Sequence, residues 1–369
     1  MIQQFNFSSV RGKIKFLLMA FNSTKVEKPM GRMLAMLRLM PSVKFLLWCS
    51  RPDVCEAVCQ FLAQNKVTYT AGKYDVNHLP DHLECIVVYE NFSNVDTWIR
   101  DAFFPATLAN GHCMLLDTID ESGKGQGWAK RMEQMNLASG TKFKVIGVSD
   151  VQVESSAIAG GDMLVDGRWV FLGKKRPLLE RLMGEQFGPN VEIVVLHEKE
   201  PYPLLYHIDL FLTLTGIVEN EQYVVLLGQC VALTTAMEEV ARQQNVCLDK
   251  IASRLQKDYG IKVVRNPLPL GQHLYVYNNC LIEVTSESKT VWLPAYSTDH
   301  PEHDALKALE KENETIWREL GFNPCLVSAP FGDLLGVKAG LHCITNEVRS
   351  YSLEDFFDNK RSKIWYTHS

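Results

Sequence analysis

The sequence lacks the features that mark a zinc-binding, disulfide-linked or membrane-spanning protein. Its ten cysteines include no Cys-x-x-Cys pair and no Cys/His group at zinc spacing, so we interpret them as reduced, mostly buried thiols. No apolar run approaches the length of a transmembrane helix, because the stretch 14–21 is short and is interrupted by Lys15. We therefore expect a cytoplasmic protein that is not integral to a membrane.

A field of positive charge is also lacking. The 369 residues include 38 Lys and Arg against 43 Asp and Glu, which gives a formal net charge of -5. Proteins that hold a nucleic-acid backbone concentrate positive charge, so a nucleic-acid partner is not expected. The composition, 46% hydrophobic and 22% charged, is that of a globular protein with a large core.

No Pro/Gly/Ser-rich or low-complexity linker divides the chain, which favours one large domain over residues 44–369. Residues 1–43 are predicted to form a basic extension, in which Glu27 is the single acid opposite seven Lys and Arg. One interpretation is a targeting presequence, mitochondrial or other. The favoured one is an amphipathic helix that packs its apolar side on the domain, namely Met30, Met33, Leu34, Met36 and Leu37. A homodimer is left open.

A module of hairpin, helix and strand recurs along the chain. Clear copies begin at Asp162, Asp209 and Asn279, and the copy at Asp209 contains strands 210–214, 223–227 and 261–264 around a helix that ends near Tyr259. A less regular copy covers 44–89, and a last one begins near His342. Alternating strands and helices predict an α/β fold. Polar capping repeats for a linear array are not evident, so we expect the modules to close as a propeller.

Chemically reactive residues stand at the starts of these modules. In a closed ring, equivalent module positions converge on the axis, so we expect several carboxylates, one imidazole and one thiol to meet there. The segments concerned are Trp98-Ile99-Arg100-Asp101, Gly160-Gly161-Asp162, His207-Ile208-Asp209 and His342-Cys343.

Such a set fits a planar guanidinium. Asp101 and Asp209 would clamp it, because paired carboxylates match the fork of N–H donors. Cys343 would add to the central carbon, helped by neighbouring positive charge. His207 would protonate the leaving amine and then deprotonate the attacking water.

The same segments, with Asn278-Asn279 before a hairpin and the ending Gly340-Leu341-His342-Cys343-Ile344-Thr345, resemble the guanidino-group-modifying enzymes. The nearest subgroup is the agmatine and arginine deiminases, and the resemblance covers about 44–349. It implies a five-bladed α/β propeller of the pentein type, a covalent thiouronium intermediate on Cys343, and no metal or organic cofactor. It also implies a small guanidino substrate, or an arginine side chain, held by a set of residues around the two clamping acids: Trp98, Arg100, Asp101, Asp162, Asp209 and Asn279.

One position departs from that pattern. These deiminases usually have Glu before Gly-Gly, where this chain has Ala159; Asp162 is either a partial substitute or structural. An amidinotransferase on the same scaffold and a non-catalytic binding propeller are the alternatives to a hydrolase, and a cysteine protease is a remote one. Agmatine, arginine, methylated arginine and protein-bound arginine all stay open as substrates.

Overall fold

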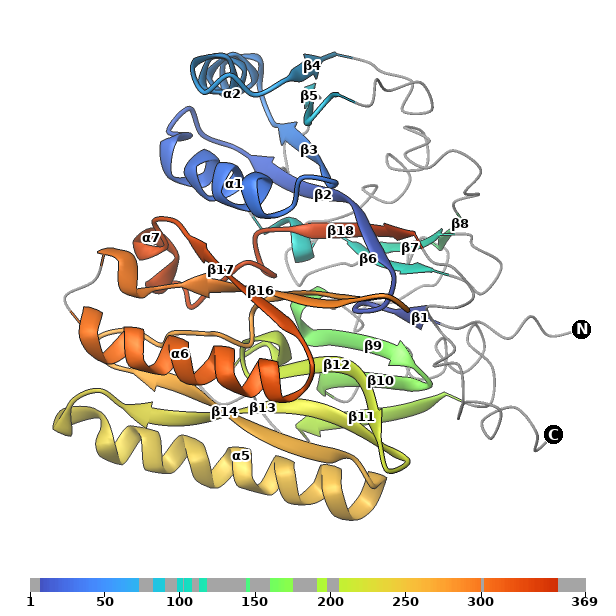
Figure 1. The fold of residues 1–369 in the computed structure, drawn as a ribbon, viewed down its shortest axis with the longest axis vertical. Helices are drawn as coiled ribbons and strands as arrows, with labels where there is room; N and C mark the ends of the chain where they lie inside the picture. Colours follow the sequence, from blue (N-terminus) through green and yellow to red (C-terminus); the bar gives the residue numbers. More distant parts are fainter. Residues whose placement is uncertain are drawn as a thin grey trace, which may run out of the picture.

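The computed structural model describes residues 7–72, 82–89, 98–101, 103–107, 113–117, 144–146, 160–174, 191–197, 206–299 and 302–350. Within these ranges the strands form five sheets, and each contains an antiparallel pair whose second member pairs with a parallel strand. Figure 1 shows the strands inside and the helices along the outside. The predicted α/β class is confirmed.

Two of the sheets are formed by consecutive strands of predicted modules. The first contains β12 (Leu212–Glu219), β13 (Gln222–Ala232) and β14 (Lys262–Leu270). The second contains β15 (Leu281–Val284), β16 (Lys289–Ala295) and β17 (Asn323–Ser328). The hairpin, helix and strand order predicted for these two modules is confirmed.

The other three sheets follow the same topology with additions. One contains β9 (Met163–Gly167), β10 (Trp169–Lys174) and β11 (Glu192–His197), with β1 (Phe7–Ser8) at its edge. Another contains β6 (Phe103–Thr107), β7 (Cys113–Asp117) and β8 (Lys144–Ile146). The last has the order β18 (Asn346–Ser350), β2 (Lys13–Phe21), β3 (Lys44–Cys49), β5 (Cys85–Tyr89), β4 (Tyr69–Ala71). The module that begins at Asp162 is expected to have its helix over 177–187, which lies outside the described residues. Closure of the ring stays a prediction.

Helix α5 (Glu238–Tyr259) illustrates why the sequence forms these elements. Two acids, Glu238 and Glu239, occupy its first turn, where negative charge is stabilised by the helix dipole. Gly260 follows it with φ of 64°, a left-handed conformation that glycine adopts without strain. Its buried residues recur every three or four positions, so that one stripe packs on β13 and β14: Ala241, Gln244, Leu248, Ile251 and Leu255.

Helix α6 (His303–Glu319) buries polar side chains, although its highly charged sequence suggests that they are exposed. Glu310 is 3% exposed and accepts hydrogen bonds from the backbone N and Oγ of Ser297, at 2.8 and 2.7 Å. Asn313 is fully buried and bonded to Asn266. The helix contacts both β14 and β17, so this side is a packing face and not a solvated one.

The N-terminal segment, predicted to be an extension that ends at residue 43, contributes a strand and a helix. Strand β2 pairs with β3 on one side and β18 on the other, and residues 16–21 are buried. Helix α1 (Glu27–Leu39) follows it and buries Met30, Met33 and Met36, as the amphipathic interpretation predicted. Strands before and after residue 43 thus pair in one sheet, and the domain boundary stays a prediction. A continuous apolar strand such as β2 is expected to be paired at both edges and buried on both faces. The basic residues around it make this apolar pattern hard to recognise in the sequence.

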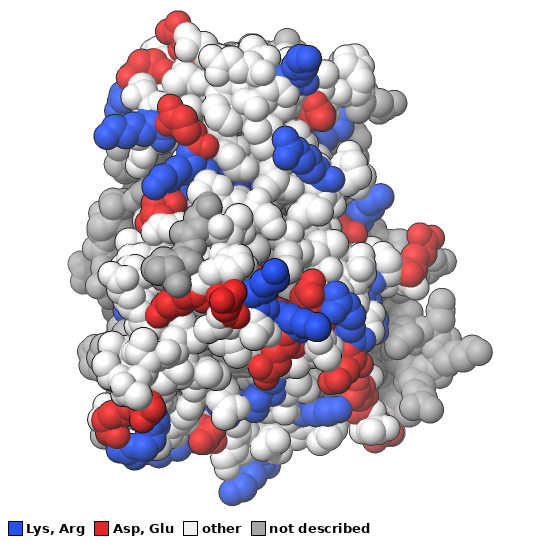
Figure 2. Space-filling view, turned by 60° about the vertical axis from the view of Figure 1, so that its left-hand side comes forward, with Lys and Arg blue, Asp and Glu red and all other residues white. Residues whose placement is uncertain are grey.

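No helix in the described ranges is long and apolar enough to cross a membrane. Figure 2 shows that acidic and basic side chains are interspersed over one face of the molecule. Among the residues described there, neither sign forms a continuous field.

Candidate active site

Three short turns that begin predicted modules lie against one another. They are η2 (Ile99–Asp101), η4 (Gly160–Asp162) and η5 (Ile208–Leu210), with η4 in contact with both of the others. A Cβ on Gly160 would stand 2.0 Å from the carbonyl oxygen of Arg100. One on Gly161 would stand 2.9 Å from His207 Nδ1 and 3.0 Å from Asp209 Oδ2. The two glycines are therefore required by the close approach of these turns.

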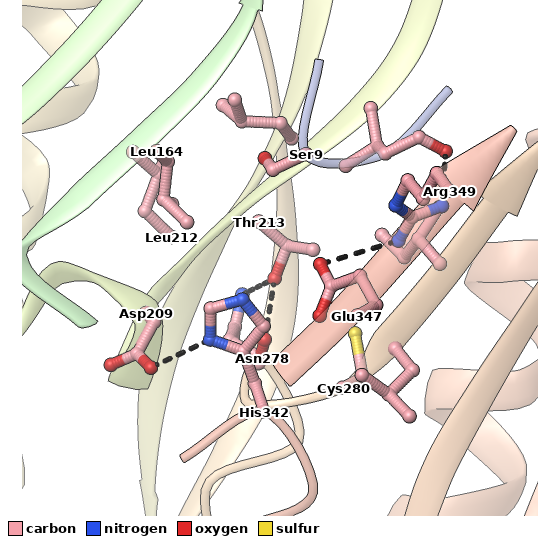
Figure 3. Close-up of a pocket in the computed structure, with 14 residues that line it drawn as sticks. Ser9, Leu164, Asp209, Leu212, Thr213, Asn278, Cys280, His342, Glu347 and Arg349 are labelled. Carbon is pink, nitrogen blue, oxygen red and sulfur yellow. Dashed lines mark hydrogen bonds and ion pairs between the residues drawn. The ribbon is translucent and has the colours of Figure 1, made fainter. Parts of the chain in front are cut away.

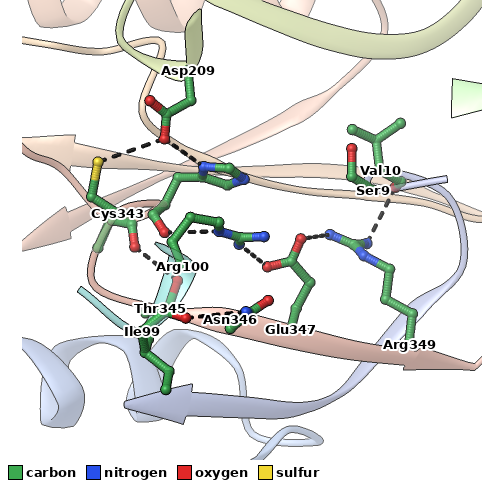
Figure 4. Close-up of polar contacts among 12 residues, drawn as sticks. Ser9, Val10, Ile99, Arg100, Asp209, Cys343, Thr345, Asn346, Glu347 and Arg349 are labelled. Carbon is green, nitrogen blue, oxygen red and sulfur yellow. Dashed lines mark hydrogen bonds and ion pairs between the residues drawn. The ribbon is translucent and has the colours of Figure 1, made fainter. Parts of the chain in front are cut away.

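Asp209 is the centre of the cluster. It is 2% exposed, and its Oδ2 lies 2.8 Å from His342 Nδ1 and 3.5 Å from the thiol of Cys343 (Figures 3 and 4). Asn279 Nδ2 also lies 2.9 Å from this oxygen. Its Oδ1 is buried and accepts no hydrogen bond from the described residues. A buried carboxylate oxygen without a donor is costly, so N–H groups of a ligand that reached this atom would be bound favourably.

The charge of Asp209 is stabilised by its neighbours. Burial by itself raises the pKa of a carboxyl group. Here the hydrogen bond from His342, with the charges of His342, His207 and Arg100, outweighs burial and holds the pKa of Asp209 below its usual value. The group is therefore an anion at neutral pH, as a ligand for a guanidinium must be.

Asn279 holds the nucleophile candidate in place. It is fully buried, and its Oδ1 accepts hydrogen bonds from the backbone N–H groups of Gly340 and Cys343, both at 3.0 Å. Its Nδ2 donates to Cys343 Sγ at 3.0 Å as well as to Asp209. One amide thus fixes the turn, the sulfur and the acid together. The predicted substrate contact of Asn279 stays a prediction.

A second buried cluster lies directly behind His342. Glu347 forms ion pairs with Arg100 and Arg349, and Arg100 Nε also donates to the carbonyl oxygen of His342 at 3.2 Å (Figure 4). Burial raises the pKa of Glu347, but the charges of Arg100 and Arg349 together have the larger, opposite effect and lower this pKa to about 2. Arg100 is 1% exposed, so its guanidinium supports the turn of His342 and Cys343 from within.

A cavity of about 20 Å³ separates the two clusters (Figure 3). Its lining includes Asp209, His342, Glu347 and Arg349, with Thr213 on β12 and Asn278. Its size is that of about one water molecule. A guanidino compound therefore does not fit there.

The remaining predicted residues are distributed as follows. His207 is half-buried, and its Nδ1 and the Oδ2 of Asp209 both lie beside Gly161. The carboxylate of Asp162 packs on β10, where a Cβ on Gly173 would stand 1.8 Å from its Oδ1. Trp98 is half-buried and packs on the core. The side chain of Asp101 and residue Ala159 lie outside the described structure.

Two residues were missed by sequence reasoning. His342 was noted as the neighbour of Cys343 but received no role, although a histidine at a module start was itself a signal. The sequence around Glu347 contains no signal of a role, because an acidic residue on a strand is ordinarily exposed. Among the described residues, no group of His, Cys, Asp and Glu side chains has the arrangement of a metal site.

Comparison with known proteins identifies the fold. No family model matches the sequence, and no curated protein matches it by sequence. A solved X-ray structure of a protein designated an agmatine deiminase matches with a TM-score of 0.63 at 12% identity, covering 95% of this chain and 97% of that one. Agmatine deiminase of Enterococcus faecalis matches with a TM-score of 0.57 at 14% identity, over 94% and 96%. The chain has the agmatine deiminase fold. The resemblance drawn from short motifs thus extends, at the level of fold, over nearly the whole length of these deiminases.

Proposed function

We propose that the protein is a hydrolase that removes an amino group from the guanidino carbon of a small compound. The site consists of Cys343 as nucleophile, His207 as proton carrier, and Asp209 and Asp101 as the guanidinium clamp. His342 and Asn279 are positioning residues for Asp209 and Cys343. Arg100 and Glu347 are the support behind them.

One observation carries the proposal: a single buried carboxylate contacts the thiol with one oxygen and has no described donor on the other. Cys343 Sγ and Asn279 Nδ2 lie on Oδ2 of Asp209, whereas Oδ1 accepts no hydrogen bond from the described residues. A guanidinium that donates to Oδ1 puts its central carbon near the sulfur. Its positive charge also favours the thiolate that attacks.

The reaction follows in two halves. The thiolate of Cys343 adds to the guanidino carbon and forms a C–S bond, the C–N bond to one nitrogen breaks, and His207 gives that nitrogen a proton as it leaves. A water molecule then adds to the thiouronium carbon while His207 takes its proton, and the C–S bond breaks. One water is consumed, ammonia is released, and a ureido compound is the product.

Closure of the five units around one centre belongs to the same proposal, with the whole chain as a single catalytic domain. The contacts between turns support it. Arg100 lies against Gly160, that turn lies against Asp209, and Asp209 bonds to Asn279. Asn279 bonds to the backbone of Cys343, and the neighbouring carbonyl of His342 bonds back to Arg100. This circuit returns to the turn where it begins, as a ring requires.

The test is incubation with agmatine, arginine and butylguanidine, with ureido product and ammonia measured. We expect both products without any acceptor amine, and their loss in Cys343→Ala. Cys325→Ala, which changes a thiol on β17, is the matched control and keeps activity. Turnover that persists in Cys343→Ala refutes the nucleophile, and product that requires an acceptor amine indicates an amidinotransferase.

A further inference from the structure

The side of the site that leads to solvent is defined by a gradient of exposure. Asp209 and Cys343 are 2% and 8% exposed, His207 is half-buried, and Tyr206 is 37% exposed. The rings of Tyr206 and His207 make an edge contact with centroids 4.7 Å apart. Tyr206 Oη also donates to the backbone oxygen of Val337 at 2.8 Å. The segment just before the nucleophile turn is thus tied to the outer side of the proton carrier.

Lys338 places a positive charge at this point. Its Nζ lies 5.6 Å from the centroid of the Tyr206 ring, within the range of a cation–π contact. Its backbone has φ of 55°, a left-handed conformation that is uncommon for residues other than glycine and that clusters at functional sites. The side chain is half-buried, and burial lowers the pKa of Lys338. A bound anion would offset that cost, because it stabilises the charged form.

We infer that Lys338 binds the far end of the substrate and selects guanidino compounds that carry a carboxylate there. The inference rests on the proposed function, which fixes the guanidinium between Asp209 and Cys343. From that position a short alkyl chain directed past His207 would lead toward Tyr206 and the ammonium of Lys338. A carboxylate at its end is attracted, whereas an ammonium such as that of agmatine is repelled.

Lys338 would then determine specificity without taking part in the chemistry. Because the contact is made equally in the bound substrate and in the transition state, its loss should raise KM and leave kcat nearly constant. A merely structural lysine, which holds Tyr206 and the turn of Cys343, would instead change kcat for every substrate alike.

The experiment uses three compounds of matched length that differ in terminal charge: 4-guanidinobutyrate, butylguanidine and agmatine. We expect the order of kcat/KM in the parent protein to be the acid, the neutral compound, then the amine. In Lys338→Gln the ratio of the acid to the neutral compound should fall about 10- to 100-fold, the worth of one hydrogen bond to a charged group, through KM. Lys338→Glu should invert the preference toward agmatine, and Lys338→Arg should retain the parent order.

Lys311→Gln, a change at an exposed lysine on α6, is the control and should leave all ratios as they are. The inference is overturned if agmatine is the best substrate of the parent, or if Lys338→Gln changes the three compounds by the same factor. These outcomes are separate from failure of the proposed function, in which none of the three yields a ureido product with the parent protein. Since ratios are compared within one variant, partial loss of folded protein cancels.

Discussion

Asp209 and Glu347 are two buried acids on opposite sides of His342, and they differ in what surrounds them. Glu347 is 2% exposed and pairs with two arginines through both of its oxygens. Asp209 is equally buried, yet its contacts fall on one oxygen and come from a histidine, an amide and a thiol. In both, neighbouring groups lower the pKa against the effect of burial.

The difference separates a structural acid from one suited to a ligand. The charge of Glu347 is more than neutralised within the protein, so nothing further is needed to keep it there. Asp209 has an oxygen that the described chain leaves without a donor, and a cationic ligand would complete its surroundings. If this distinction is right, substitution of Glu347 should lower the stability of the protein, whereas substitution of Asp209 should lower its activity.

The largest effect is expected for Asp209→Asn. The change removes the negative charge that holds the guanidinium while keeping the volume, so kcat/KM should fall by about 10⁴-fold, the scale seen when a charged catalytic partner is removed. Stability should change little, because the loss of a buried charge offsets the altered hydrogen bonds. Steady-state kinetics with urea unfolding measures both. Unchanged affinity for the substrate would count against the clamp.

Glu347→Gln should show the opposite pattern. It leaves Arg100 and Arg349 buried without a counter-charge, a situation that costs about 3–5 kcal/mol of unfolding free energy. Denaturant unfolding measures it, with Glu287→Gln on an exposed turn as the matched control. If Glu347→Gln is as stable as the parent protein, the ion pairs do not hold the site together.

The same pair predicts how stability depends on pH. The pKa of Glu347 is about 2 in the folded state and about 4.3 in the unfolded state. The stabilisation that this difference gives the folded protein is therefore complete above about pH 5. As the pH falls toward 2 the unfolded state takes up the proton first, and stability decreases by up to about 1.4 kcal/mol per pH unit. The lowered pKa of Asp209 acts in the same direction. Between pH 6 and about 2.5, the free energy of unfolding should depend less on pH in Glu347→Gln than in the parent protein. An equal dependence in the two proteins would contradict the assignment.

His342 joins the two acids, and its replacement should have the smallest effect. His342→Leu removes the group beside Asp209 Oδ2 and should reduce kcat about 10- to 100-fold through misplacement of the acid. His342→Asn keeps an N–H donor near the position of Nδ1 and should restore most of the activity. A pH–rate profile of both variants is the additional readout. Equal loss in the two would indicate that the ring itself, and not its hydrogen bond, matters.

The sequence by itself determined the local units and the chemistry that they carry. Periodicity predicted the strands and helices of the modules at Asp209 and Asn279, because alternation and helical spacing are local properties of the chain. The positions of Asp209, Cys343 and Asn279 at module starts predicted that they would share one site, and the structure joins them by hydrogen bonds.

What the tertiary structure decided depends on contacts between distant residues. Nothing local in 13–21 indicates that this strand pairs with 346–350, since strand partners are chosen by register and burial across the whole fold. Likewise, the side chain of Glu310 is held inside the protein because it accepts a hydrogen bond from Ser297, which lies outside its helix. The assignment of one Asp209 oxygen to the thiol, and the position of Lys338 over Tyr206, arise only when separate units pack, because each is a contact across the fold and not a pattern within a segment.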